Sequence, residues 1–421
     1  MGATVALVNA VVVTGTGRDR FDGAVVVEGD RIADVLEGGG RPSDVDLVVD
    51  CRGRALLPGL IDAHVHIGAL DVDIQQQHRR YFDSEAALLM GRALTGLLEL
   101  GYTTVRDAGG ADAGFRRAVQ QGVVAGPRLL VSGHPLSQTG GHGDVRQRAE
   151  QGDVVGCGAQ VGLACRLADG PDEVRRAVRE ELRRGVDQIK VMASGGVMSP
   201  TDPLEATQYS AEEIRVAVQT AKQAGSYVLA HAYTPDSIQM CVRAGVRSIE
   251  HGNLIDAETA ALMAEHGTFL DPTLIAYQAL YEEGEKHGVP AENLEKLQVV
   301  LDAGLDSLRI AQAAGVKIAS GSDLLGPLAA GTGREIGIKA QVLGALGAIT
   351  ASTLTNAELL RLDDRLGSIA PGKQADLIVV DGDPVDDPGL LGRAEHLSLV
   401  MIGGRLHKNT LGRGRHMTVP S

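Results

Sequence analysis

The fold of this 421-residue chain can be predicted outward from residues 56–68, LLPGLIDAHVHIG. Within this stretch Leu60–His66 is predicted to be a short buried strand, because it is a short, mainly apolar run. The strand ends in His64-Val65-His66. Side chains two positions apart in a strand point to the same side, so both imidazoles can reach one ion.

Short β runs alternate with helical stretches from about Pro58 to about Arg365. The predicted strands are Leu60–His66, Thr103–Asp107, Arg128–Ser132, Gln188–Met192, Tyr227–His231, Ser248–His251, Thr268–Asp271 and Val316–Ser320. The predicted helices include Glu85–Leu100, Asp172–Arg184, Glu212–Ala224 and Asp256–Glu265. Ser210 with Glu213 forms a capping-box pattern. Six glycines follow a helix as C-terminal caps do: Gly101, Gly185, Gly225, Gly245, Gly267 and Gly315.

Eight such β–α alternations predict an α/β fold of the (β/α)8 TIM-barrel type. The alternative is a doubly wound open sheet, but no GxGxxG motif follows the first strand. Strand-like segments return at both ends of the chain. They are Val5–Val13, Gly23–Val27 and Asp46–Cys51 before the alternation, and Ala375–Asp381 and Leu399–Gly404 after it. We expect these terminal strands to pair into one small sheet module.

Composition narrows the functional classes. The formal charge of −14 argues against nucleic acid or an anionic membrane surface as partner. The aromatic share is 3% and Trp is absent, which argues against base stacking. Cys51, Cys157, Cys165 and Cys241 form no CxxC pair, so no zinc ribbon or thioredoxin-like motif is encoded. With no basic segment before the first apolar stretch and no bilayer-length apolar run, we expect a cytoplasmic protein.

Ionisable residues follow several of the predicted strands. His231 and His251 end two of them, and Asp323 follows the last, in Ser320-Gly321-Ser322-Asp323. Lys190 lies inside an apolar strand, where burial lowers the pKa of an amine. A neutral amine can take up CO2, and the resulting carbamate can bridge two cations. The alternative for Lys190 is a snorkelling or salt-bridged side chain.

These residues fall together at the carboxyl ends of the strands, where barrel enzymes keep their sites. Imidazole nitrogens and carboxylate oxygens are ligands for divalent metals. We therefore predict a metal centre, the alternative being histidines that are satisfied within the core.

The motif set resembles the metal-dependent amidohydrolase superfamily. The strings that carry the resemblance are LLPGLIDAHVHIG, QIKVMASGG, LAHAYT, IEHGN, SGSD and GSIAPGKQADLIVVDGDP, in a match from about residue 4 to 405. The resemblance implies a distorted barrel over 58–365 and a β-sandwich built from 1–57 plus 366–421. It implies two divalent metal ions, usually zinc. His64, His66 and Asp323 would bind the first ion and His231 and His251 the second, with N6-carboxylated Lys190 joining them.

A closer resemblance is to the imidazolonepropionase-related group, which contains Xaa-Pro dipeptidases, carboxypeptidase-like enzymes and ochratoxin-hydrolysing amidases. It is carried by Thr139–Asp144, GGVMSPTDP and His231-Ala232-Tyr233-Thr234. Thr234 stands where the one-metal deaminase branch has Glu, which counts against that branch.

The predicted reaction is hydrolysis of an amide beside a free carboxylate, by attack of a metal-bridging hydroxide. Asp323 would move the proton from water to the leaving nitrogen. Tyr233 is a candidate donor to the oxyanion. His142 is a candidate for holding the substrate carboxylate or polarising the carbonyl. The alternatives are a packed loop tyrosine and a structural histidine.

The remaining histidines carry less weight. His134 follows the third strand and is a weaker pocket candidate. Six others are predicted to be surface residues: His78, His266, His287, His396, His407 and His416. The loop 195–207 is expected to shape the pocket.

Three functions compete. The first is a binuclear peptidase or amidase acting on a Xaa-Pro or related dipeptide, an N-acyl amino acid or an ochratoxin-like amide. The second is a cyclic amidohydrolase that opens a lactam or imidazolone ring. The third, an inactive scaffold, predicts eroded ligands, and none of the six is missing. The partners expected are a small-molecule substrate and further copies of the chain in a homo-oligomer.

Overall fold

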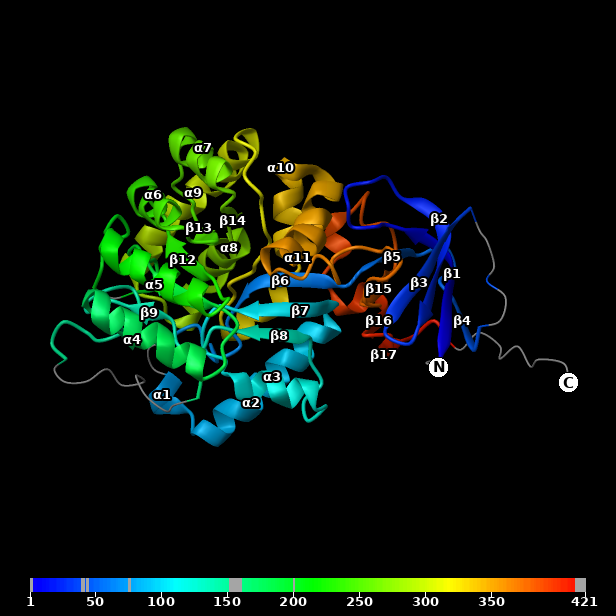
Figure 1. Ribbon diagram of the computed structural model, residues 1–421, viewed down its shortest axis with the longest axis horizontal. Helices are drawn as coiled ribbons and strands as arrows, with labels where there is room; N and C mark the ends of the chain where they lie inside the picture. The colour runs from blue at the N-terminus through cyan, green and yellow to red at the C-terminus, as the bar shows by residue number, and fades with distance from the viewer. Residues whose placement is uncertain are drawn as a thin grey trace, which may run out of the picture. The chain divides into compact units, whose positions relative to one another are not determined.

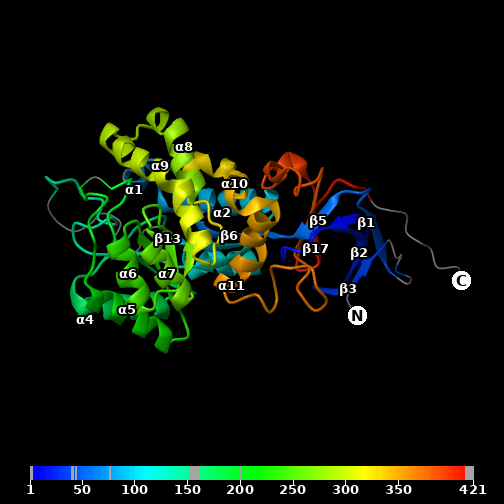
Figure 2. The ribbon, with the colours of Figure 1, turned by 90° about the horizontal axis from the view of Figure 1, so that it is seen from above.

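The computed structural model describes residues 3–38, 42, 45–74, 77–150, 161–199 and 201–412. Cys157 and His416 lie outside the described residues. The chain divides into two compact units (Figures 1 and 2). The first comprises residues 1–62, 95–104 and 336–421, and the second comprises residues 63–94 and 105–335.

The first unit contains one eight-stranded sheet made from both ends of the chain. Its strands are β1 (Thr4–Val12), β2 (Phe21–Glu28), β3 (Arg31–Glu37), β4 (Leu47–Asp50), β5 (Ala55–Pro58), β15 (Leu377–Val380), β16 (Leu397–Ile402) and β17 (Arg405–Asn409). Their order is β17-β16-β15-β5-β1-β2-β3, with β4 beside β1. The early and late parts of the chain meet where β5 pairs antiparallel with β15. The predicted pairing of the terminal strands is therefore present.

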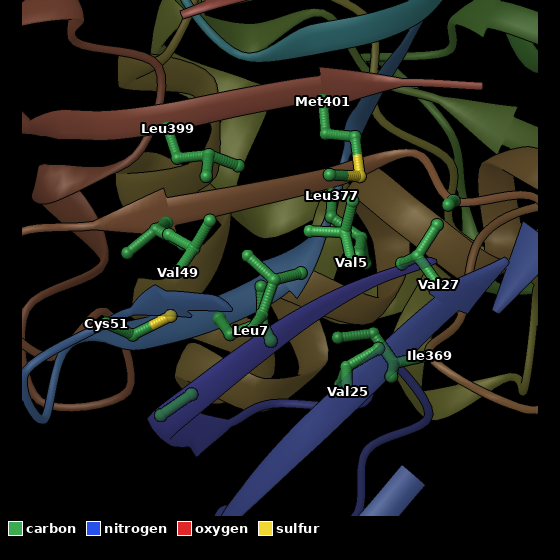
Figure 3. Close-up of a cluster of buried hydrophobic side chains, with 14 of the residues drawn as sticks. Val5, Leu7, Val25, Val27, Val49, Cys51, Ile369, Leu377, Leu399 and Met401 are labelled. Carbon is green, nitrogen blue, oxygen red and sulfur yellow. The ribbon is translucent and has the colours of Figure 1, made fainter. Parts of the chain in front are cut away.

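The sheet of the first unit curls around an apolar cluster. Val25 and Val27 of β2 belong to the same buried cluster as Leu399 and Met401 of β16, although several strands separate them in the sheet (Figure 3). Burying these side chains removes apolar surface from water, which stabilises the unit. β-branched residues are favoured here because they pack well on a pleated surface.

The alternating part of the fold lies mostly in the second unit, although parts of β6 and β7 are assigned to the first. The strands of the alternation are β6 (Leu60–Val65), β7 (Tyr102–Asp107), β8 (Arg128–Val131), β9 (Leu136–Ser137), β10 (Arg166–Leu167), β11 (Ile189–Met192), β12 (Val228–Ala232), β13 (Ser248–His251) and β14 (Phe269–Asp271). They form a three-stranded sheet, β6-β7-β8, and a six-stranded sheet, β10-β9-β11-β12-β13-β14. Neighbouring strands of the six-stranded sheet pair in parallel, so they end at one edge.

Helices separate most of these strands. They are α1 (Gln77–Arg80), α2 (Asp83–Glu99), α3 (Ala113–Gln120), α4 (Gly170–Arg183), α5 (Ala211–Gln223), α6 (Pro235–Ala244), α7 (Ala257–His266), α8 (Leu274–Glu283), α9 (Ala291–Ala313), α10 (Arg334–Thr350) and α11 (Asn356–Leu359). Helices α4 to α7 pack against one another in the order in which they follow in the sequence (Figure 1). The capping box of Ser210 and Glu213 opens α5 as predicted. All six predicted capping glycines have positive φ.

The predicted strand Val316–Ser320 is wrong. This segment makes only an isolated bridge, between Leu270 and Ile318. The residues that follow bond to β6 and not to β14. Ser320 accepts a hydrogen bond from the backbone of Ala63, and the backbone of Asp323 donates one to His64. Its backbone hydrogen bonds are thus divided between two strands, and neither pairing is long enough to form a ladder. The two described sheets do not close into one continuous barrel.

Residues 334–359, which include α10 and α11, are long and apolar enough to cross a membrane by length and composition alone. Core helices of globular proteins pass the same test. Glu335 and Lys339 are both buried in this stretch, which is unfavourable in hydrocarbon. The expected absence of a membrane partner and the cytoplasmic location stay predictions.

Candidate active site

Four predicted histidines gather at the ends of their strands. His64 ends β6 with its ring centroid 5.1 Å from that of His66 and 5.4 Å from that of His251. The rings of His231, in β12, and His251, at the end of β13, lie 4.6 Å apart. All four side chains are almost fully buried. The structure therefore brings together the imidazoles that the strand pattern grouped.

Asp323 joins this cluster from the segment that follows β14 and α9. Its Oδ1 lies 3.3 Å from Nε2 of His66 and 3.5 Å from Nε2 of His64. Gly321 makes this approach possible, because a Cβ at that position would overlap the side chain of His64. Asp323 itself has a φ of 51°, a left-handed conformation that is uncommon outside glycine and recurs at functional sites.

The outward nitrogen of each histidine is already hydrogen-bonded. Nδ1 of His66 contacts the carbonyl oxygen of Gly109 at 2.9 Å, and Nε2 of His231 contacts that of Gly195 at 3.0 Å. A carbonyl oxygen only accepts, so these nitrogens carry the protons. The opposite nitrogens are left with lone pairs. This arrangement of a ligand histidine and its supporting acceptor is typical of metal sites.

The lone-pair atoms of this cluster are arranged as the ligands of a cation would be. Nε2 of His64 lies 3.3 Å from Nε2 of His66, and both lie within 3.5 Å of Asp323 Oδ1. With the Nδ1 protons directed elsewhere, three acceptor atoms face one another at this point. Ligand atoms of His64, His251 and Asp323 also lie within 4.8 Å of one another. A positive charge among these atoms is needed to offset their repulsion.

The pKa values agree with this interpretation. Burial lowers the pKa of His64, His231 and His251 well below that of a free imidazole, so these rings are neutral and able to ligate. Burial also acts to lower the pKa of His66. Its hydrogen bond to Asp323 and the charge of that carboxylate outweigh burial, so the pKa is raised above that of a free imidazole. Without a metal, His66 therefore tends to bind a proton between its ring and Asp323. A bound metal ion would supply the same positive charge there.

Lys190 lies in β11 with 1% of its surface exposed and contributes to the same pocket. Burial lowers the pKa of its amine, although the charges of Glu250 and Asp323 act in the opposite direction. A buried amine with a lowered pKa is more often neutral, and the neutral form is the one that reacts with CO2. Carboxylation of Lys190 remains a proposal.

A buried ion pair, which the sequence analysis missed, supports His64. Glu250 accepts a hydrogen bond from His64 Nδ1 at 2.7 Å. The same carboxylate accepts two from Nη2 of Arg106, at 2.9 and 3.0 Å, and one from Ser248 Oγ at 2.5 Å. Arg106, Glu250 and His64 are all fully buried. Glu250 therefore fixes which nitrogen of His64 carries the proton.

Glu250 and His251 are neighbours in sequence, yet both contact the site. His251 has a φ of 78°, so the chain turns sharply at the end of β13 instead of continuing the strand alternation. Nδ1 of His251 lies 2.8 Å from Oγ1 of Thr273. A charged residue inside a predicted strand, directly before a candidate ligand, was the signal that could have indicated Glu250.

His142 and Tyr233 lie against the histidine cluster. The ring of His142 stacks on that of His231 at 4.2 Å, and its Nδ1 is 2.9 Å from Ser199 Oγ. Gly196 lies directly against this ring, where any Cβ would overlap it. The ring of Tyr233 stacks on that of His251 at 5.2 Å. Both predicted residues therefore reach the site, but the structure does not assign their chemical roles.

The histidine cluster forms the polar end of a pocket within the second unit. Its other walls are largely apolar and include Ile74, Leu163, Val197 and Leu280. Val197 comes from the loop 195–207, which was expected to shape the pocket. Pockets of this kind, apolar with a few convergent polar groups, are typical of small-molecule sites.

Two further histidines, His78 and His134, lie outside the cluster of candidate ligands. His78 was predicted to be a surface residue, and this was wrong, because it lines the pocket with Nε2 2.8 Å from the carbonyl oxygen of Leu163. Its helix, α1, is four residues long and lies next to the pocket, which no periodicity reveals. His134 is directed to Glu181, with its Nδ1 3.4 Å from the carboxylate. It is not among the described residues that line the pocket.

Comparison with known proteins identifies the family. Residues 55–407 match the family model described as the Amidohydrolase family. The chain belongs to the amidohydrolase family. This amidohydrolase is 34% identical to the ochratoxinase of Aspergillus niger over 374 residues, which cover 85% of this chain and 76% of the relative. The predicted resemblance is thereby confirmed.

Two solved structures are similar over nearly the whole amidohydrolase chain. A prolidase complexed with N-methylphosphonate-L-proline is 43% identical, with a TM-score of 0.93 and coverage of 97% of this chain and 100% of that one. A Xaa-Pro dipeptidase with methionine bound in its active site is 30% identical, with a TM-score of 0.87 and the same coverage. The chain is accordingly a hydrolase of amide bonds, from a family that generally uses divalent metals.

Proposed function

We propose that this amidohydrolase is a binuclear metal-dependent dipeptidase, which cleaves the amide bond beside a free carboxylate in Xaa-Pro or a related dipeptide. The observation that carries the proposal is the meeting of four imidazoles, Asp323 and the buried Lys190 at the polar end of one pocket. The 43% identity to a prolidase complexed with an N-methylphosphonate of proline supports this class of substrate.

We assign the ligands by their positions in the cluster. His64, His66 and Asp323 would hold one ion, because their Nε2 and Oδ1 atoms lie within 3.5 Å of one another. His231 and His251 would hold the other. Lys190, as its carbamate, would supply an oxygen to each. Nitrogen and oxygen ligands of this kind suit zinc.

When bound, such ions polarise the scissile carbonyl and lower the pKa of a water molecule. The protein side chains then perform the proton transfers. Asp323 accepts the proton of the attacking water and gives it to the leaving nitrogen. Burial acts to raise the pKa of Asp323, but its hydrogen bond to His66 and the nearby positive charge lower it overall, so the carboxylate is ionised and can accept a proton.

Two side chains are proposed to contact the substrate. Tyr233 donates its hydroxyl proton to the developing oxyanion, since burial raises its pKa and keeps that proton in place. His142 holds the substrate carboxylate. Its hydrogen bond to Ser199 and its stacking on His231 fix the ring at the edge of the pocket.

We propose that residues 58–365 form the distorted (β/α)8 barrel and that residues 1–57 plus 366–421 form the β-sandwich. The backbone hydrogen bonds of residues 317–323 to Leu270, Ala63 and His64 support a barrel whose eighth position is irregular. The homo-oligomer stays a prediction.

The test is an assay for amino-acid release. Zinc-loaded protein, grown with bicarbonate, is incubated with Xaa-Pro, Xaa-Arg and Xaa-hydrophobic dipeptides and N-acyl amino acids, and the products are identified by mass spectrometry. Each active dipeptide is paired with its C-terminal carboxamide. The proposal predicts release from Xaa-Pro substrates and a large loss of kcat/KM with the carboxamides.

Two outcomes contradict the proposal. Equal rates with a dipeptide and its carboxamide would show that the free carboxylate is not recognised. No release from any compound by protein that holds two metals would favour the alternative, opening of a lactam or imidazolone ring.

A further inference from the structure

Tyr277 of α8 lies beside both Tyr233 and His251, with its ring centroid 6.2 Å from each. Its hydroxyl is 3.0 Å from that of Tyr233 and 3.4 Å from Oγ1 of Thr273. Oγ1 of Thr273 is in turn 2.8 Å from Nδ1 of His251. The hydroxyl groups of Thr273 and Tyr277 therefore connect the ring of His251 to that of Tyr233, the proposed oxyanion donor.

All members of this row are buried within the second unit. Thr273 is fully buried, and the exposed fractions of Tyr233, Tyr277 and His251 are 3% or less. Buried hydroxyl groups are rarely left without hydrogen-bond partners, so each proton in the row has a definite direction. Tyr233 and Tyr277 also both contribute to the pocket wall.

The direction of hydrogen-bond donation along this row follows from His251, and this step rests on the proposed function. If Nε2 of His251 serves a metal, its Nδ1 carries the proton and donates it to Thr273. Thr273 Oγ1 then accepts, and its own proton goes to the oxygen of Tyr277. Tyr277 in turn donates to the oxygen of Tyr233. The proton of Tyr233 has no acceptor within the row and is left for the pocket.

We propose that Tyr277 is a positioning residue, which holds the hydroxyl of Tyr233 with its proton directed at the oxyanion of the substrate. In the opposite direction Tyr233 would donate its proton to the oxygen of Tyr277 as a hydrogen bond and present only lone pairs to the substrate. Lone pairs would repel a developing negative charge, so the direction of the row decides whether Tyr233 can assist the reaction.

A kinetic cycle tests this role. Tyr233→Phe, Tyr277→Phe and the double variant are compared with Tyr281→Phe. The control makes the same change on the same helix, at a side chain that is 60% exposed. Removal of an oxyanion donor lowers kcat about 100- to 1000-fold, which we expect for Tyr233→Phe. Loss of one neutral hydrogen bond corresponds to about tenfold, which we expect for Tyr277→Phe.

The pattern of effects separates positioning from a structural role. Tyr277→Phe should lower kcat with KM within about twofold and with unchanged metal content. In the Tyr233→Phe background it should have no further effect, because the residue acts only through Tyr233. An equal loss of kcat in both backgrounds, or no loss in either, would overturn the proposal.

A second measurement is independent of turnover. Neutron diffraction from deuterated, zinc-loaded crystals locates the hydroxyl deuterons directly. The proposal predicts a deuteron on Tyr277 directed at the oxygen of Tyr233, and the deuteron of Tyr233 directed into the pocket. A deuteron on Tyr233 directed at Tyr277 would refute it. This result decides the direction of the row even if the release assay shows that the proposed substrate class is wrong.

Discussion

The substitution Glu250→Gln tests the support of the metal site most sharply, because it keeps the size of the side chain and removes its charge. Oε2 of Glu250 accepts hydrogen bonds from His64 and Arg106, and Oε1 accepts from Arg106 and Ser248. An amide nitrogen cannot accept. Whichever of the two positions the amide nitrogen takes, two of the four hydrogen bonds lose their acceptor.

The magnitude follows from these four bonds. A hydrogen bond to a charged group contributes about 1.5–3 kcal/mol, and breaking a buried ion pair costs about 3–5 kcal/mol. The guanidinium of Arg106 is fully buried, and among the described residues its only other carboxylate partner is the more distant Asp271, at 3.8 Å. We expect the free energy of unfolding to fall by about 3–5 kcal/mol.

Metal affinity should fall as well. Without a carboxylate on Nδ1, the ring of His64 is less basic and its proton is no longer confined to that nitrogen. Loss of such a supporting group typically lowers metal affinity about 10- to 100-fold. Competition with a chelator measures the affinity, and urea unfolding of the metal-free protein measures the stability.

The matched control is Glu265→Gln, an exposed glutamate in α7. It should leave both quantities unchanged. The reasoning is refuted if Glu250→Gln is folded, with the stability of the control, and binds zinc within about twofold of it. That result would show that Glu250 does not determine the proton position on His64.

Three further predictions concern the same centre. Asp323→Asn should abolish turnover while circular dichroism shows an intact fold, and retained activity would exclude the proton transfer. Lys190→Ala should lose metal and regain it with added short-chain carboxylic acids, whereas undiminished metal content would exclude a carbamate bridge. Burial lowers the pKa of His64, His231 and His251 in the fold, so the unfolded chain takes up more protons as the pH drops below about 6.5. Urea unfolding of the metal-free protein should therefore show stability falling from pH 6.5 to 5, and a level profile would contradict these shifts.

The sequence allowed the grouping of the candidate ligands to be predicted because strand alternation and parallel pairing place side chains by simple rules. His64 and His66 are two residues apart, and His231 and His251 end neighbouring parallel strands. Any ligand at these positions must reach the same edge of the sheet. Lys190 was recognisable because a charged residue is unfavourable within an apolar strand.

Contacts between distant segments could not be predicted in this way. Arg106 and Glu250 are 144 positions apart, and neither has a spacing that signals the pair. Tyr277 lies in a helix whose apolar residues show no distinct face, so its hydroxyl row depends on tertiary packing. The strand predicted at 316–320 failed because backbone hydrogen bonds divided between two strands leave no trace in residue periodicity.

The most direct test of the central claim is a metal titration that is followed by activity. Metal-free protein is prepared with a chelator, zinc is added in steps with bicarbonate present, and release of proline from a Xaa-Pro dipeptide is measured at each step. The account predicts no hydrolysis without metal and full activity at two zinc ions per chain, with 13C-labelled bicarbonate showing one carbamate. Hydrolysis by the metal-free protein, or saturation at one ion, would contradict it.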